Sequence, residues 1–266
     1  MQMLTDDETA ELIDTAAELA AAAREATLLH FRSTGLTADT KESDRFDPVT
    51  VADRLCEERM RAILARRRPR DAILGEEMGV SSGESGLTWV LDPIDGTRSY
   101  LCGTPTWGVL ISVADETGPI YGLIDQPYIG ERFEGGLGRA VVRGPLGEQE
   151  LATRAPRPLS EAILMSTFPE IGTAEEEAAF RRLSGQVRLT RYGADCYAYA
   201  LLAAGQIDLV VEAGLQPYDV QAPMAVIEAA GGIMTDWNGR RNPEGGRVIA
   251  ASSSEMHAAA MQALRG

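Results

Sequence analysis

The stretch 89-WVLDPIDGTRSYLCG-103 places an apolar run directly before two aspartates, Asp92 and Asp95, which lie three residues apart. The apolar run predicts a buried β-strand, and Pro93 and Gly96 predict a tight turn after it. A plain turn is one interpretation, because Asp, Pro and Gly are ordinary turn residues. A cation site is the other, because two carboxylates at one strand end can hold Mg²⁺, which prefers oxygen ligands.

The composition of the chain excludes several kinds of site and partner. The 266 residues carry 40 Asp and Glu against 25 Lys and Arg, a net charge of −15 that disfavours nucleic acid and anionic membranes as partners. Three cysteines without a CxxC pair make a disulfide framework or a zinc site unexpected, and a reducing cytoplasm fits them best. Only His30 and His257 could serve as histidine ligands or bases, so carboxylates are the expected catalytic groups.

The first residues and the apolar runs of the chain predict no signal peptide and no membrane anchor. The start MQMLTDDETAEL lacks the basic and apolar regions of a signal peptide. No apolar run reaches the roughly 20 residues that span a bilayer. We therefore expect a protein that is not anchored in a membrane.

Hydrophobic periodicity changes at about residue 150. Before it, helical spacing predicts helices over 8–32 and 52–68, and closely spaced turns predict an antiparallel meander, with strands over 72–79, 89–92, 107–115, 119–127, 131–136 and 139–144 and a flexible linker over 80–86. After it, strands over 162–168, 186–192, 207–213, 233–237 and 247–252 alternate with helices over 174–184, 195–205 and 219–232 and a terminal helix to 264. We expect a mixed α/β (α+β) fold with an N-terminal α+β half over 1–150 and a C-terminal α/β half over 151–266 packed on it.

Further acidic residues stand at strand ends and helix starts. Glu76 and Glu77 follow the apolar run 72–75, and Asp219 opens a helix. Each has an ordinary interpretation, since Glu76 could be a solvated turn residue and Asp219 a helix N-cap. A Mg²⁺ site with these residues and the pair in 89–97 explains them together, and it suits a hydrolysis in which two cations stabilise the attacking and leaving oxygens.

Gly96 and Thr97 add a predicted phosphate site beside the carboxylates. A glycine that opens a helix leaves backbone N–H groups where the helix dipole favours an anion. Metal and phosphate would therefore meet at one turn, with the Ile94 carbonyl as a further metal ligand.

These motifs resemble those of the inositol monophosphatase family of Mg²⁺-dependent, lithium-sensitive phosphatases. The stretches 75-GEE-77, 89-WVLDPIDGT-97 and 218-YDVQAPMAVIEAAGG-232 are similar to its three signatures, and 48-PVTVAD-53 is similar to a segment with an auxiliary acidic residue. Within the family, DGTRSYLCGTPTWG and YGADCYAYALLAAGQIDLVVEAGLQPYD look most like the histidinol-phosphate phosphatases of bacteria and plants. The resemblance covers nearly the whole chain.

The resemblance implies the fold and the reaction. The fold would be a layered αβαβα sandwich of the sugar-phosphatase type, with the site in the cleft between the halves. The reaction would be hydrolysis of a small phosphate monoester by metal-activated water, with two or three Mg²⁺ ions, Mn²⁺ as a substitute and Li⁺ as an inhibitor. A homodimer is implied as well.

The resemblance also implies roles for individual residues. Metal ligands would be Glu76, Asp92, Asp95, Asp219, the Ile94 carbonyl and the auxiliary Asp53. Thr97 with Glu76 would orient and deprotonate the attacking water, Asp95 would belong to the same catalytic group, and the Gly96 and Thr97 amides would hold the phosphate. Lys41 aligns only loosely with a lysine of the family, and a solvated loop lysine is the alternative for it.

The substrate is predicted from two further carboxylates. Asp195 opens a predicted helix where inositol-specific relatives tend to carry a small neutral residue, although a helix N-cap is the alternative, and Glu212 ends a predicted strand. If both face the cleft, they form an anionic pocket that suits an ammonium group beside the phosphoester. Histidinol phosphate has such a group, and its imidazole could stack on Tyr218 or Trp107.

The hypothesis is therefore an L-histidinol-phosphate phosphatase of histidine biosynthesis. Inositol-1-phosphate phosphatase is the alternative within the family. A non-catalytic metal-binding protein on the same fold is the alternative from another class, and it is disfavoured because every acidic position and Thr97 are intact.

Overall fold

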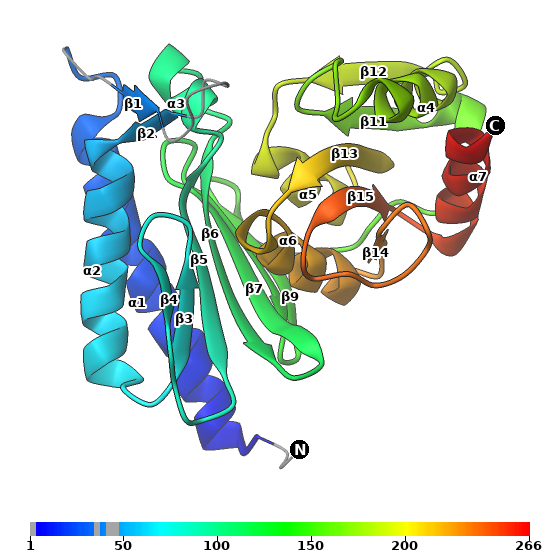
Figure 1. Cartoon of the computed structure of the whole chain (residues 1–266). Helices are drawn as coiled ribbons and strands as arrows, with labels where there is room; N and C mark the ends of the chain where they lie inside the picture. The colour runs from blue at the N-terminus through cyan, green and yellow to red at the C-terminus, as the bar shows by residue number, and fades with distance from the viewer. Residues whose placement is uncertain (1–3, 35–37, 41–47) are drawn as a thin grey trace.

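The structure is a computed structural model that describes residues 4–34, 38–40 and 48–266. Its helices are arranged around two large β-sheets (Figure 1). The first has the order β10-β9-β8-β7-β6-β5-β3-β4, with β3 (Ala72–Gly75), β4 (Gly79–Ser81), β5 (Thr88–Asp95), β6 (Gly108–Asp115), β7 (Gly118–Gln126), β8 (Glu131–Gly136), β9 (Arg139–Gly144) and β10 (Gly147–Glu150). The second has the order β12-β11-β13-β15-β14, with β11 (Ile163–Ser166), β12 (Leu189–Tyr192), β13 (Leu209–Leu215), β14 (Ile233–Thr235) and β15 (Gly246–Ala251). A separate short pair joins β1 (Ala38–Thr40) to β2 (Pro48–Thr50).

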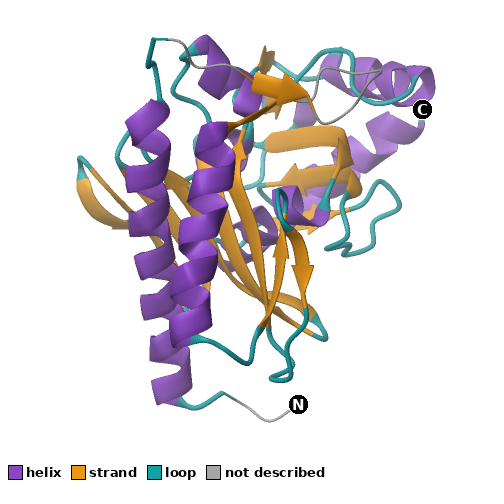
Figure 2. Ribbon diagram, turned by 60° about the vertical axis from the view of Figure 1, so that its left-hand side comes forward, coloured by secondary structure: helices purple, strands orange, loops and turns teal. Residues whose placement is uncertain are grey.

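Helices cover both sheets and fill the space between them (Figures 1 and 2). The long helices α1 (Asp6–His30) and α2 (Val51–Arg67) lie side by side on the outer face of the first sheet. Between the sheets lie α5 (Cys196–Ala203) and α6 (Pro217–Ala229), and α4 (Ala174–Ser184) and α7 (Ser254–Arg265) cover the far side. The short α3 (Thr97–Cys102) and a 3-10 turn (Leu159–Glu161) complete the described elements. The predicted αβαβα sandwich is confirmed.

The central strands of both sheets are buried on both faces, which is why β5, β6 and β13 contain continuous apolar runs. On β13, Val210 packs toward α5 and α6, whereas Leu209 and Val211 pack toward α4 and α7. On β6, Leu110 joins the core between the sheets and Ile111 joins the core under α1 and α2. Successive side chains of a strand point to opposite faces, so each strand contributes to two cores.

The predicted elements are recovered with differences at their ends. The strand predicted over 89–92 continues to Asp95, because it stays paired with β6 across an irregular register. Part of the predicted linker over 80–86 is β4, which pairs with β3, and β10 was missed because its exposed, polar sequence carries no apolar alternation. The division of the chain at residue 150 stays a prediction, since α5 and α6 pack directly on the first sheet. Among the helices of the described residues, none has the length and apolar character needed to cross a bilayer.

Candidate active site

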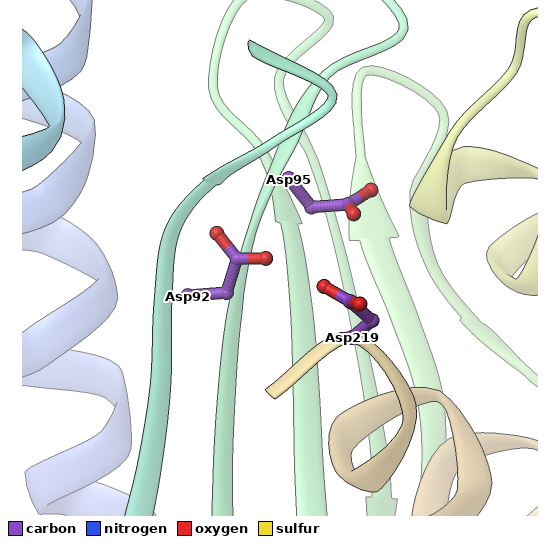
Figure 3. Close-up of side chains that lie close together, drawn as sticks. All are labelled: Asp92, Asp95 and Asp219. Atoms are coloured by element: carbon purple, nitrogen blue, oxygen red, sulfur yellow. The ribbon is translucent and has the colours of Figure 1, made fainter. Parts of the chain in front are cut away.

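Three carboxylates converge where β5 ends beside the start of α6 (Figure 3). One oxygen from each of Asp92, Asp95 and Asp219 lies within 4.8 Å of the others. Asp92 is buried, and the other two are half-buried. The predicted acidic site therefore exists as a cluster of oxygen donors from two elements that are far apart in the sequence.

A β-bulge brings Asp92 and Asp95 to the same side. Residues separated by three on a regular strand point to opposite faces of the sheet. Here Asp92 pairs with Leu110 but Asp95 pairs with Gly108, so one extra residue is inserted on β5 between them. The bulge reverses the alternation, and both side chains of the pair reach one cavity.

The charges of the cluster oppose one another. Burial, and then the charges of Glu76, Asp95 and Asp219, raise the pKa of Asp92 well above its usual range. Burial also raises the pKa of Asp95, against a hydrogen bond of 2.6 Å from the Cys196 N–H, and it raises the pKa of Asp219 to about 7. Hard oxygen donors that repel one another fit a divalent cation such as Mg²⁺, which would offset this repulsion.

The backbone of the turn that follows β5 lies very close to the Asp195 side chain. Gly96 has a φ of 84° in the left-handed region, and a Cβ at this position would lie 2.7 Å from the Asp195 Cγ, so glycine is required for both reasons. The Thr97 hydroxyl donates to the Ile94 carbonyl at 3.1 Å. Ile94, Gly96 and Thr97 line the same cavity as the three aspartates, with a volume of about 630 Å³.

The two other predicted acidic ligands, Glu76 and Asp53, lie in different places relative to the cavity. Glu76 follows β3 directly and lines the cavity with the cluster. Asp53 lies in the first turn of α2, where its Oδ2 accepts from the Thr50 N–H at 2.8 Å and the Thr50 hydroxyl at 2.5 Å, and burial raises its pKa to about 6. Asp53 thus forms a capping box with Thr50, a pattern that the spacing of the two residues already carries, and its role as an auxiliary metal ligand stays a prediction. Lys41 lies outside the described residues.

The predicted substrate residues Asp195, Glu212 and Tyr218 all line this cavity. Asp195 stands at the N-cap of α5 but makes no capping hydrogen bond; its Oδ2 accepts from the Ser99 hydroxyl at 2.5 Å. Glu212 accepts from the Thr167 N–H and from the Tyr199 hydroxyl, each at 2.8 Å. The N-cap interpretation of Asp195 is therefore wrong, because its side chain turns toward α3.

Trp107 does not line the cavity. Its side chain is fully buried against Phe31 and Tyr100, with ring centroids 5.2 and 4.9 Å away. The suggestion that it could stack on a substrate is wrong, because the apolar side chain serves the core instead.

Two residues that line the cavity, Arg98 and Phe168, were not predicted from the sequence. The Arg98 guanidinium carbon lies 5.2 Å from the centre of the Phe168 ring, and both side chains line the cavity. Arg98 directly follows the turn residue Thr97, so its position in the motif was a usable signal. Nothing in the sequence around Phe168 placed it opposite α3. Among the described residues of the cavity wall, Arg98 carries the positive charge.

Comparisons with known proteins agree with this geometry. Residues 8–266 match the inositol monophosphatase family. The chain is 43% identical over 237 residues to the chloroplastic bifunctional phosphatase IMPL2 of Arabidopsis thaliana, covering 85% of this chain and 68% of that protein. It is 35% identical over 248 residues to a histidinol-phosphatase of Streptomyces coelicolor, covering 90% and 91%.

A solved structure extends the comparison to the fold. An inositol monophosphatase from Zymomonas mobilis superimposes with a TM-score of 0.84 at 38% identity, covering 96% of this chain and 97% of that one. The chain therefore belongs to the inositol monophosphatase family and is a phosphoric monoester hydrolase.

Proposed function

We propose that this phosphatase hydrolyses L-histidinol phosphate in histidine biosynthesis. The observation that carries the proposal is that Asp195 and Glu212 line the same cavity as the three clustered aspartates. Two carboxylates near a phosphate site favour a substrate with an ammonium group beside its phosphoester. The likeness to a histidinol-phosphatase of Streptomyces coelicolor supports it. Inositol-1-phosphate is the second candidate, favoured by the likeness to the Zymomonas mobilis inositol monophosphatase.

The proposed cofactor is Mg²⁺, with Mn²⁺ as a substitute. Asp92, Asp95 and Asp219 would hold it together with Glu76 and the Ile94 carbonyl. Bound Mg²⁺ supplies positive charge to the phosphate oxygens and makes hydroxide available near neutral pH.

The chain's own residues would orient the reacting groups. Because the Thr97 hydroxyl donates to the Ile94 carbonyl, its lone pairs remain available to accept a hydrogen bond from the attacking water. Glu76, on the same wall, would take the proton of that water. The Cys196 N–H holds Asp95 in place, and the Gly96 and Thr97 amides would bind the phosphate oxygens.

The proposal includes a reducing cytoplasm and a homodimer. The three cysteines are free, which is usual for a reducing compartment. Native mass spectrometry should give a dimer of the 28.6 kDa chain. A monomer alone would contradict this part of the proposal.

The substrate is tested by measuring kcat/KM for histidinol phosphate and inositol-1-phosphate side by side. We expect the wild type to prefer histidinol phosphate and Asp195→Asn to lose about thirtyfold or more on that substrate alone, since a broken ammonium–carboxylate pair costs roughly 2–5 kcal/mol. Asparagine is chosen because it can still accept from Ser99 and tolerates the φ of 48° at this position, whereas alanine would disturb both.

A matched control is Glu170→Gln, which removes a negative charge from an exposed residue of the same cavity wall. It should change kcat/KM little and equally for both substrates. A wild type that prefers the inositol ester would make inositol phosphate the better assignment. Equal losses on both substrates in Asp195→Asn would show that Asp195 does not select for the ammonium group.

A further inference from the structure

A buried carboxylate on α2 anchors the turn that follows Glu76. Glu57 is fully buried. Its Oε2 accepts from the Glu77 N–H at 2.7 Å, and its Oε1 accepts from the Met78 N–H at 3.2 Å. These are the two residues directly after Glu76, so Glu57 binds the backbone immediately beyond a cavity carboxylate.

Gly75, the residue before Glu76, has no side chain and so leaves space for the Glu57 carboxylate. A Cβ on Gly75 would lie 2.0 Å from the Glu57 Oε1, so no other residue could stand there with Glu57 in its present place. On the strand side, the Glu76 N–H donates to the Leu91 carbonyl of β5 at 3.1 Å. Glu76 is thus held between a sheet hydrogen bond on its own N–H and the Glu57 carboxylate on the two N–H groups that follow.

An arginine one helical turn further along α2 fixes the Glu57 side chain. The Arg61 Nε donates to the Glu57 Oε1 at 2.7 Å, and the Arg61 guanidinium also binds the Ser81 hydroxyl at 2.9 Å and the Gly79 carbonyl. Both oxygens of Glu57 therefore accept from donors that the fold positions. The carboxylate is charge-paired and has a single orientation, which a purely apolar contact would not impose.

We propose that Glu57 is a positioning residue that orients Glu76 toward Asp92 and thereby sets the metal affinity of the cavity. This inference rests on the metal site of the proposed function. Residues that hydrogen-bond around metal ligands typically change metal affinity by about 10–100-fold when they are mutated. Glu57 does this through the backbone, by setting where the Glu76 side chain begins.

The test is direct binding of Mn²⁺ to the metal-free protein, measured by calorimetry, for the wild type and Glu57→Gln. In the glutamine, an NH₂ group replaces one oxygen and meets either a backbone N–H or Arg61, both of which are donors. We expect the Mn²⁺ Kd to rise about tenfold or more. The Mg²⁺ concentration for half-maximal phosphatase activity should rise in parallel, and kcat at saturating Mg²⁺ should fall as well, because Glu76 is also the proposed base. The Mn²⁺ Kd of the folded protein separates both effects from general destabilisation.

Asp208→Asn is the matched control. Asp208 is also fully buried, also accepts from a backbone N–H, that of Ile163 at 2.8 Å, and also pairs with an arginine, Arg154 at 2.9 Å, but it does not line the cavity. It should lower the unfolding temperature and leave the Mn²⁺ Kd unchanged. If Glu57→Gln does not fold, Glu57→Asp keeps the charge and shortens the reach, and it should show the same rise in Kd to a smaller degree.

The possible results distinguish a failure of the metal site from a failure of the positioning role of Glu57. A wild type that binds no Mn²⁺ would overturn the metal site itself. A wild type that binds Mn²⁺ while Glu57→Gln binds it equally well, or while Asp208→Asn loses as much affinity, would overturn only the positioning role of Glu57.

Discussion

Replacing Asp92 with asparagine is expected to lower kcat/KM by at least about a thousandfold while the protein stays folded. Asp92 is the buried member of the clustered carboxylates, and its Oδ1 accepts from the Ile94 N–H at 3.0 Å, a bond that an asparagine oxygen can keep. The neutral amide of asparagine lacks the negative charge that would bind the cation. Charge stabilisation by a metal ion contributes several kcal/mol, and about 4 kcal/mol corresponds to this loss of rate.

The same variant should be more stable than the wild type when metal is removed with EDTA. Burial and neighbouring carboxylates raise the folded-state pKa of Asp92, so the charged form is unfavourable in the folded protein. The resulting loss of stability is absent below the unfolded pKa of about 4 and grows as the pH rises through the folded-state pKa. The variant's advantage in unfolding temperature should therefore be small at pH 4 and larger at pH 8.

Three measurements check this prediction. Steady-state kinetics with saturating Mg²⁺ gives the loss of activity, and thermal unfolding in EDTA and in Mg²⁺ gives the two stabilities. Mg²⁺ should stabilise the wild type more than the variant, because only the folded wild type binds it tightly. Near wild-type activity in Asp92→Asn would show that Asp92 is not a metal ligand.

Replacing Thr97 with alanine is the second large effect, an expected fall in kcat of about a hundredfold with metal affinity unchanged. The hydroxyl is oriented by its bond to the Ile94 carbonyl and lines the cavity, where it would accept from the attacking water. Contributions from positioned proton-transfer groups are typically about 10²–10⁴-fold. Alanine removes the group without touching the carboxylates.

Thr97→Ser is the control for this experiment. Serine keeps the hydroxyl and loses only the methyl group, so it should retain most of the activity. The Mn²⁺ Kd, measured on each variant, separates an effect on catalysis from one on the metal. A loss below about threefold in Thr97→Ala would argue against a role of the hydroxyl in the reaction.

Local patterns in the sequence determined most of the fold. The apolar run along 209–211 and the helical spacing along 8–32 predict their elements because apolar side chains must face a core, wherever that core lies. The motif 89–97 with 75–77 and 218–232 also predicted the acidic cavity. Carboxylates at strand ends and helix starts tend to gather at one edge of a layered fold.

Only the tertiary structure decided how these side chains come together in one cavity. The bulge between Asp92 and Asp95 exists because β5 pairs with β6 one residue out of step, and no local pattern encodes that register. Trp107 turned into the core, where Phe31 and Tyr100 surround it. Glu57 reads in the sequence as an ordinary charge on a helix, yet packing brings it to the turn after Glu76, twenty residues from its Glu77 partner. Sequence periodicity reports which way a side chain points from its own element, whereas contacts between distant elements determine what it meets there.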